Sequence, residues 1–158
     1  MATVYIETTV PSYYFETRRS PQVVAWKAAT RTWWDRYRSV YDLSLSRLVL
    51  AELAAAPSSK ARPALSLVEG LTVLDEPQEL SAVAEFYMLH RAMPVEARGD
   101  AYHLAMASIH RVDFLLTWNC RHLANANKIR HLTILNGRLG LPIPIITTPL
   151  TLLPEDAE

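Results

Sequence analysis

Three acidic side chains occupy positions where a strand should end or a helix should begin. Glu7 follows the β-branched and aromatic run TVYI, Glu52 lies on the second turn of an expected helix, and Asp100 opens a helix that leads into the apolar run FLL. Carboxylates from separate elements that meet at one sheet edge would hold a hard cation, because Mg²⁺ and Mn²⁺ prefer oxygen ligands. Such a site would activate water for hydrolysis of phosphodiesters.

Each acid also has a structural interpretation. The helix macrodipole favours an Asp in the first helical turn, and Glu7 could be a solvated acid at a strand end. Glu52 is a lone acid among small or apolar neighbours that we expect to be buried. Such an acid needs a partner or a metal, because an unpaired buried carboxylate is costly enough that the chain would neutralise, pair or expose it instead. Thr8 and Thr9 follow Glu7, where their hydroxyls could brace the carboxylate.

Strands alternate with helices along the chain, which predicts a three-layer α/β/α domain with a mainly parallel, about five-stranded sheet. The expected strands cover residues 3–6, 41–46, 71–74, 114–116 and 143–146. The better-defined helices are expected from Pro21 to about Arg38, after Ser46, from Pro77 to Leu89, from Asp100 onward, and from about Asn127 to Leu139. Pro144 indicates an edge strand, because proline cannot donate to a central ladder. The carboxyl ends of the strands, including Asn119, should face a common crevice.

The composition limits the function classes. A chain of 158 residues fits one domain, and 16 basic against 16 acidic residues exclude a global basic field. The single Cys120 agrees with a reducing compartment, so we expect a cytoplasmic protein. The sequence has no leader pattern at its start and no stretch of membrane-spanning length, so we expect no membrane association.

Two surface features suggest binding partners. Trp26, Trp33, Trp34 and Tyr37 form one aromatic stripe at helical spacing, which is core packing or a subunit contact. The segment 121–138 is rich in basic residues and almost free of acids, and we expect Arg121, Lys128 and Arg130 to hold substrate phosphates. The basic residues between positions 18 and 38 are interpreted as a solvated face, with RNA contact as the alternative.

Four segments together resemble the PIN-domain nucleases: YIETT at 5–9, SRLVLAEL at 46–53, GDAYHLAMA at 99–107 and LLTWN at 115–119. The resemblance covers nearly the whole chain and is strongest to the toxin ribonucleases of type II toxin-antitoxin modules. It implies a PIN-like domain over residues 1–149. The short C-terminal tail at 150–158 is expected to be frayed. The resemblance also implies Mg²⁺ or Mn²⁺ as cofactor, RNA as substrate, an antitoxin partner and a homodimer.

The resemblance assigns Glu7, Glu52, Asp100 and Asn119 as metal ligands and catalytic residues. Glu52 and Asp100 match the family pattern, whereas Glu7 and Asn119 stand where the family usually has Asp. Glu7 keeps the charge but adds a methylene, and Asn119 keeps an oxygen ligand and loses the charge. The site then carries at most three negative charges, enough for one metal.

The remaining family positions are supporting ones. Thr8 and Thr9 fall where the family places a hydroxyl beside the first acid, and His103 should pack or hydrogen-bond beneath the site. The main hypothesis is therefore a metal-dependent endoribonuclease. Because two acids are altered, the alternative is a PIN-like module that binds RNA or a protein without cleavage. A phosphatase-like enzyme is a third hypothesis, but the first strand lacks the paired aspartates that it needs.

Overall fold

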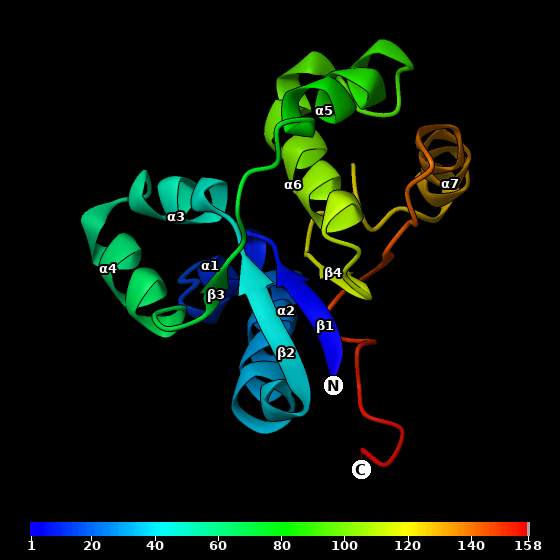
Figure 1. The fold of residues 1–158 in the computed structure, drawn as a ribbon. Coiled ribbons are helices and arrows are strands. Elements are labelled where there is room, and N and C mark those ends of the chain that lie inside the picture. The colour runs from blue at the N-terminus through cyan, green and yellow to red at the C-terminus, as the bar shows by residue number, and fades with distance from the viewer. Residues whose placement is uncertain (158) are drawn as a thin grey trace.

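The computed structural model describes residues 1–157 and has a parallel sheet at its centre (Figure 1). Its strands follow the order β3-β2-β1-β4-β5, and every neighbouring pair is parallel. The strands are β1 (Ala2–Ile6), β2 (Tyr41–Leu45), β3 (Thr72–Val73), β4 (Phe114–Leu116) and β5 (Ile145–Thr147). The five-stranded parallel sheet expected from the sequence is confirmed, with β5 at an edge.

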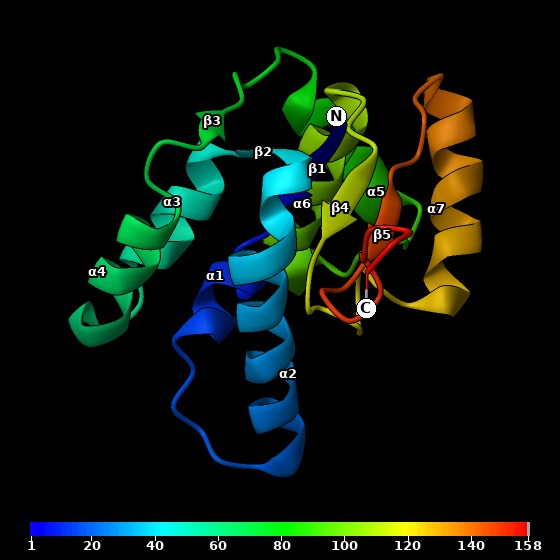
Figure 2. The same cartoon turned by 90° about the horizontal axis from the view of Figure 1, so that it is seen from below.

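Helices cover both faces of the sheet and complete the three layers (Figures 1 and 2). The helices on one face are α1 (Thr9–Tyr14), α2 (Pro21–Thr32), α3 (Arg47–Ala54) and α4 (Ser58–Leu67). Those on the other face are α5 (Leu80–Leu89), α6 (Arg98–Ile109) and α7 (Ala126–Leu139). Three single turns are η1 (Trp33–Tyr37), η2 (Arg38–Val40) and η3 (Val95–Ala97). Within residues 1–157 no helix is long and apolar enough to cross a membrane.

Most helix boundaries follow the capping residues of the sequence. Ser46 Oγ accepts a hydrogen bond from the backbone N–H of Val49 and so caps α3. Gly140 ends α7 with a left-handed φ of 69°, a conformation that favours glycine. Three expected boundaries differ. The helix α5 begins at Leu80 and not at Pro77, whose carbonyl accepts from Leu80 N in a turn. The helix α6 begins at Arg98, two residues before Asp100, and α2 ends at Thr32, from where η1 and η2 continue past Arg38.

The aromatic stripe packs within the domain. Trp33 and Trp34 are only 0% and 3% exposed, and Trp26 stacks on Trp118 with ring centroids 4.5 Å apart. Tyr37 packs against the same core. The stripe is therefore core packing, and it gives no support to a homodimer or antitoxin contact through these rings.

The C-terminal segment is anchored and not frayed as expected. Leu152 is 5% exposed, and its carbonyl accepts a hydrogen bond of 2.7 Å from Trp33 Nε1. This buried hydrogen bond holds the segment against the core, so the expectation of a frayed tail from residue 150 is wrong at Leu152.

The order of the strands places a crevice at the carboxyl end of β1. The chain runs from β1 to β2 on one side and later adds β4 on the other side, so β1 is the topological switch point of the sheet. Ligand sites of open parallel sheets lie outside the carboxyl ends of the strands at this point. Glu7 directly follows β1 and Thr117 directly follows β4, which places both at the crevice.

Candidate functional site

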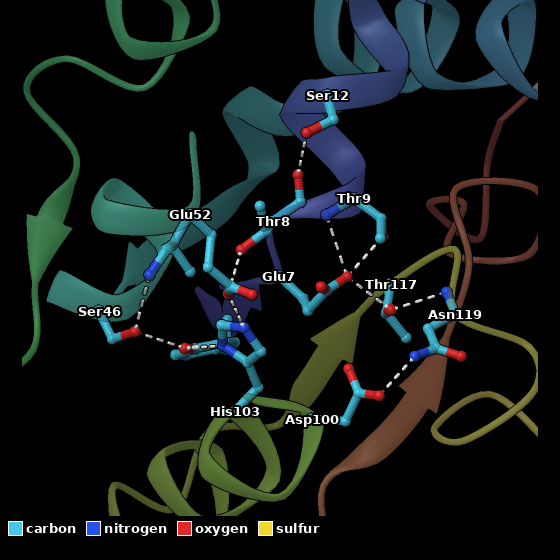
Figure 3. A network of polar contacts seen from close by, with 12 residues as sticks. Glu7, Thr8, Thr9, Ser12, Ser46, Glu52, Asp100, His103, Thr117 and Asn119 are labelled. Carbon is cyan, nitrogen blue, oxygen red and sulfur yellow. Dashed lines mark hydrogen bonds and ion pairs between the residues drawn. The ribbon is translucent and has the colours of Figure 1, made fainter. Parts of the chain in front are cut away.

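The four residues predicted as ligands lie together at this edge (Figure 3). They come from separate elements: Glu7 after β1, Glu52 on α3, Asp100 in the first turn of α6 and Asn119 after β4. In Figure 3 the three carboxylates point toward a common space, with Asn119 beside Asp100. The fold therefore brings together side chains that are up to 112 positions apart, from 7 to 119.

Glu7 is the most tightly held acid. It is 3% exposed, and its Oε2 accepts hydrogen bonds from Thr9 Oγ1 at 2.5 Å, Thr9 N at 3.1 Å and Thr117 Oγ1 at 2.7 Å. Thr9 Oγ1 in turn accepts from the backbone N–H of Trp118 at 2.8 Å. Three donors on one oxygen fix the position of the carboxylate and leave Oε1 directed toward the other acids.

Glu52 is held by a chain of buried hydrogen bonds that starts at Ser46. Ser46 Oγ and His103 Nδ1 each lie 2.7 Å from the hydroxyl of Tyr5, and His103 Nε2 lies 2.5 Å from Glu52 Oε1. Thr8 Oγ1 donates to the same Glu52 oxygen at 2.8 Å. If both ring nitrogens of His103 carry protons, each donates outward, one to Tyr5 and one to Glu52.

Asp100 pairs with Asn119, but not through the oxygen of the amide. Asn119 Nδ2 donates to Asp100 Oδ2 at 2.8 Å. The Oδ1 atom of Asn119 accepts instead from the backbone N–H groups of Arg121 and His122 at 3.1 and 3.0 Å. The amide group is thus oriented by its surroundings with its donor toward the acids, which differs from the expected oxygen ligand.

The charges of the site act on one another. The pKa of Asp100 is raised to about 6, mainly by burial and secondly by the charge of Glu7. The charge of His103 and the hydrogen bond from Asn119 act in the opposite direction. Burial alone would lower the pKa of His103, but the hydrogen bond to Glu52 and the neighbouring carboxylates raise it. Burial would raise the pKa of Glu52, yet His103 and Thr8 lower it. These directions favour an ionised pair of Glu52 and His103, beside an Asp100 whose charged form is disfavoured by burial and by Glu7.

The donor set suits a hard divalent cation. All three acids offer oxygen, and within residues 1–157 Glu7 Oε1, Glu52 Oε2 and Asp100 Oδ1 accept no hydrogen bond. In this part of the chain, however, no three His, Cys, Asp or Glu side chains are already arranged around one ion position. The carboxylates would have to move closer together to share one metal ion.

Sequence reasoning anticipated part of this network and missed the rest. Thr9 does brace Glu7, but Thr8 braces Glu52 instead. Glu52 is paired with His103 and its side chain is 38% exposed. Of its neighbours expected to be buried, Leu53 is buried, whereas the alanines at 51, 54 and 55 are exposed. Tyr5 and Thr117 were not among the predicted site residues, although a polar Thr at the end of a strand beside Asn119 was a signal for the latter.

The predicted phosphate-binding residues are divided between two places. Arg121 and Lys128 line one cavity beside the acids, whereas Arg130 is exposed on α7 two positions after Lys128, outside that cavity lining. Residues two apart on a helix do not share a face. Lys128 Nζ donates to the carbonyl of Ala92 at 2.8 Å, which fixes this side chain at the cavity.

Comparison with known proteins supports the fold. No family model and no curated protein matches the sequence. Among solved structures, the chain is similar to a chain of VapBC2 from Rickettsia felis bound to a DNA fragment from their promoter. The two share 12% sequence identity with a TM-score of 0.57, over 92% of this chain and 98% of that chain. At this identity the likeness shows the fold alone, and the chain has the PIN fold that the sequence resemblance implied.

Proposed function

We propose that the chain is a PIN-domain endoribonuclease that uses Mg²⁺ or Mn²⁺ to hydrolyse RNA phosphodiesters. The observation that carries this proposal is the convergence of Glu7, Glu52 and Asp100 at the switch point of the sheet, each with one oxygen that accepts no hydrogen bond from residues 1–157. The elevated pKa of Asp100 supports the same conclusion, because a cation would offset the repulsion from Glu7.

The residues would divide the work. Glu7, Glu52 and Asp100 would hold the metal, which when bound would lower the pKa of a coordinated water and stabilise negative charge on the phosphate. Asn119 would orient Asp100 by its amide donor and would not act as a ligand. His103, with Thr8, would keep the carboxylate of Glu52 ionised and in position.

Cleavage and metal binding should be tested together. Purified protein is incubated with a labelled RNA oligonucleotide in Mg²⁺, Mn²⁺ or EDTA, and metal binding is measured by calorimetry. Glu52→Gln and Asp100→Asn should each abolish cleavage and weaken metal binding, while the exposed Glu69→Gln serves as a charge-matched control with normal activity. Unaltered cleavage by both site variants would refute the assignment.

A second candidate is a PIN-like module that binds RNA or a protein without cutting. It is favoured by Asn119, whose amide donates to Asp100 at a position where the resembling family has an acid. It is also favoured because no three ligand side chains within residues 1–157 already surround one ion position. The same experiment separates the two, because this candidate predicts RNA binding without cleavage in either metal.

We further propose an antitoxin protein as partner and the cytoplasm as location. The similar solved structure is a VapBC2 complex, which supports a toxin-antitoxin module. Co-expression with the neighbouring open reading frame, followed by co-purification, tests the partner. The homodimer stays a prediction, and light scattering of the purified chain measures it.

A further inference from the structure

A cavity near the acid cluster includes Arg121 and His122, which follow Asn119 in the chain. It has a volume of about 580 Å³ and lies between the C-terminal end of α5, η3 and the loop that follows β4. Two of its lining residues, Arg121 and His122, donate their backbone N–H groups to Asn119 Oδ1. Asn119 therefore contacts both Asp100 and the backbone of two residues that line the cavity.

The polar part of this cavity is basic and has no anionic partner. Arg91, Arg121, His122 and Lys128 line it, against one acid, Glu96. Within residues 1–157 none of these four basic side chains forms an ion pair, and neither guanidinium donates a hydrogen bond. Positive groups gathered in a concave surface attract an anion.

His122 adds a polar atom without a partner to the same cavity. Its Nδ1 atom is buried and has no hydrogen-bond partner in residues 1–157, which is uncommon for a buried polar atom. Burial lowers the pKa of His122, and the charges of Lys128 and Arg121 lower it further. Both cations thus lie close enough to the imidazole to act on it, and an anion between them would relieve their mutual repulsion.

The rest of the wall is apolar. Met88, Met93, Pro94 and Val95 line the same cavity, and Val95 is 64% exposed although it is aliphatic. A flat heterocycle would cover such a surface, and a phosphate attached to it would meet the basic side chains. A ligand with both parts is a nucleotide, and single-stranded RNA presents nucleotides in this unstacked form.

We propose that this cavity binds one nucleotide of single-stranded RNA, next to the scissile phosphate at the acid cluster. The base packs on the wall of Met88 and Val95, and the phosphate contacts the guanidinium groups of Arg91 and Arg121. This assignment rests on the proposed ribonuclease function, since it takes RNA as the substrate. It adds Arg91, which the sequence did not single out, as a substrate-binding residue.

The chain offers a closely matched pair of variants. Arg91 and Arg111 each follow a His at the C-terminal end of a helix and have left-handed φ values of 59° and 55°. Glycine adopts this conformation without strain, so Arg91→Gly and Arg111→Gly each remove one positive charge with the same backbone requirement. Arg111 lies near Thr3 and Asp42, at the amino-terminal edge of the sheet and away from the acids.

The test is binding of adenosine 5′-monophosphate in EDTA, measured by calorimetry and NMR, so that the metal site has no influence. We expect the wild-type chain to bind it, Arg91→Gly to bind at least about tenfold more weakly, and Arg111→Gly to bind normally. In an RNA-cleavage assay Arg91→Gly should raise KM and leave kcat unchanged. Absence of binding, or equal losses in both variants, would overturn the proposal.

Competitors identify the part of the ligand that is recognised. If inorganic phosphate or adenosine competes as strongly as the nucleotide, the cavity does not recognise base and phosphate together, and the proposal is contradicted. If an acidic peptide binds more tightly than the nucleotide and depends on Arg91, the cavity is reassigned to a protein partner. The two proposals fail separately. Nucleotide binding without any RNA cleavage refutes the ribonuclease alone, whereas Glu52-dependent cleavage without nucleotide binding refutes the cavity alone.

Discussion

Asn119 directs its amide nitrogen at Asp100, with 2.8 Å between Nδ2 and Oδ2, while two backbone N–H groups hold its oxygen away from the acids. An aspartate at this position would keep both backbone hydrogen bonds but would repel Asp100. Because the amide is neutral, the site has no fourth negative charge, and the amide nitrogen also holds Asp100 in place. This arrangement leads to the first prediction.

Asn119→Asp should make the metal-free protein less stable and should increase its affinity for the metal. At pH 7 we expect a loss of about 1–2 kcal/mol in the free energy of unfolding, because two carboxylates replace a hydrogen-bonded pair. Mg²⁺ affinity should increase, since a fourth oxygen anion is gained. Urea unfolding with EDTA and with Mg²⁺ measures both effects, and a variant that is more stable in EDTA would contradict the assigned amide orientation.

Glu7→Asp should weaken the site, although it introduces the residue usual in the resembling family. The shorter side chain withdraws the carboxylate by about one C–C bond, so it cannot reach all the donors of Thr9 and Thr117. Leaving such buried donors unpaired costs about 1–3 kcal/mol in stability. Thermal unfolding and Mn²⁺ titration check this, with Glu69→Asp as an exposed control. A gain in both metal affinity and cleavage would instead indicate a pocket that still fits aspartate.

Asp100→Asn should stabilise the metal-free protein at neutral and alkaline pH. The folded-state pKa of Asp100 is about 6 against an ordinary value of 3.8, so ionisation opposes folding. The wild-type chain therefore loses stability as the pH rises from about 4 to 6, and the variant does not. We expect an advantage of about 1–2 kcal/mol at pH 8, after allowance for partial solvent exposure, and none below pH 4. Unfolding curves in EDTA across this range decide it, and Mg²⁺ should reverse the order of the two proteins.

Glu16→Gln should lower the stability of the protein at neutral pH without affecting the site. The pKa of Glu16 is lowered to about 2, mainly by the hydrogen bond from the Arg18 side chain. Burial acts in the opposite direction, and the backbone N–H groups of Arg18 and Thr17 and the side chain of Lys60 further lower the pKa of Glu16. Its contribution is thus complete above about pH 4.5 and is lost as the pH falls toward 2. At pH 7 the variant should lose about 1–2 kcal/mol. Unfolding measured at pH 7 and pH 2 should show the difference only at pH 7, and a difference that persists at pH 2 would mean that packing and not charge is responsible.

The sequence by itself determined the order of the elements and where most of them begin and end. Strands and helices are recognised by apolar residues that recur every second position or every third to fourth position, and helix ends by capping residues such as Ser46 and Gly140. These signals depend only on neighbouring residues, so the sequence alone shows them. Strand ends in a parallel sheet share one edge, so the positions of Glu7 and Asp100 were sufficient to place acids together. The parallel three-layer architecture follows from the same pattern, whereas the PIN fold was implied by the resemblance of four sequence segments.

Only the tertiary structure decided how the side chains are used. The orientation of Asn119 depends on the backbone of Arg121 and His122 together with Asp100, and the position of Glu52 depends on a buried chain through His103 and Tyr5. These contacts join elements that are distant in sequence, and hydrogen bonds depend on distances of a few tenths of an ångström that no residue pattern encodes. The same holds for Arg91, because its basic cavity exists only after α5 has packed beside α7.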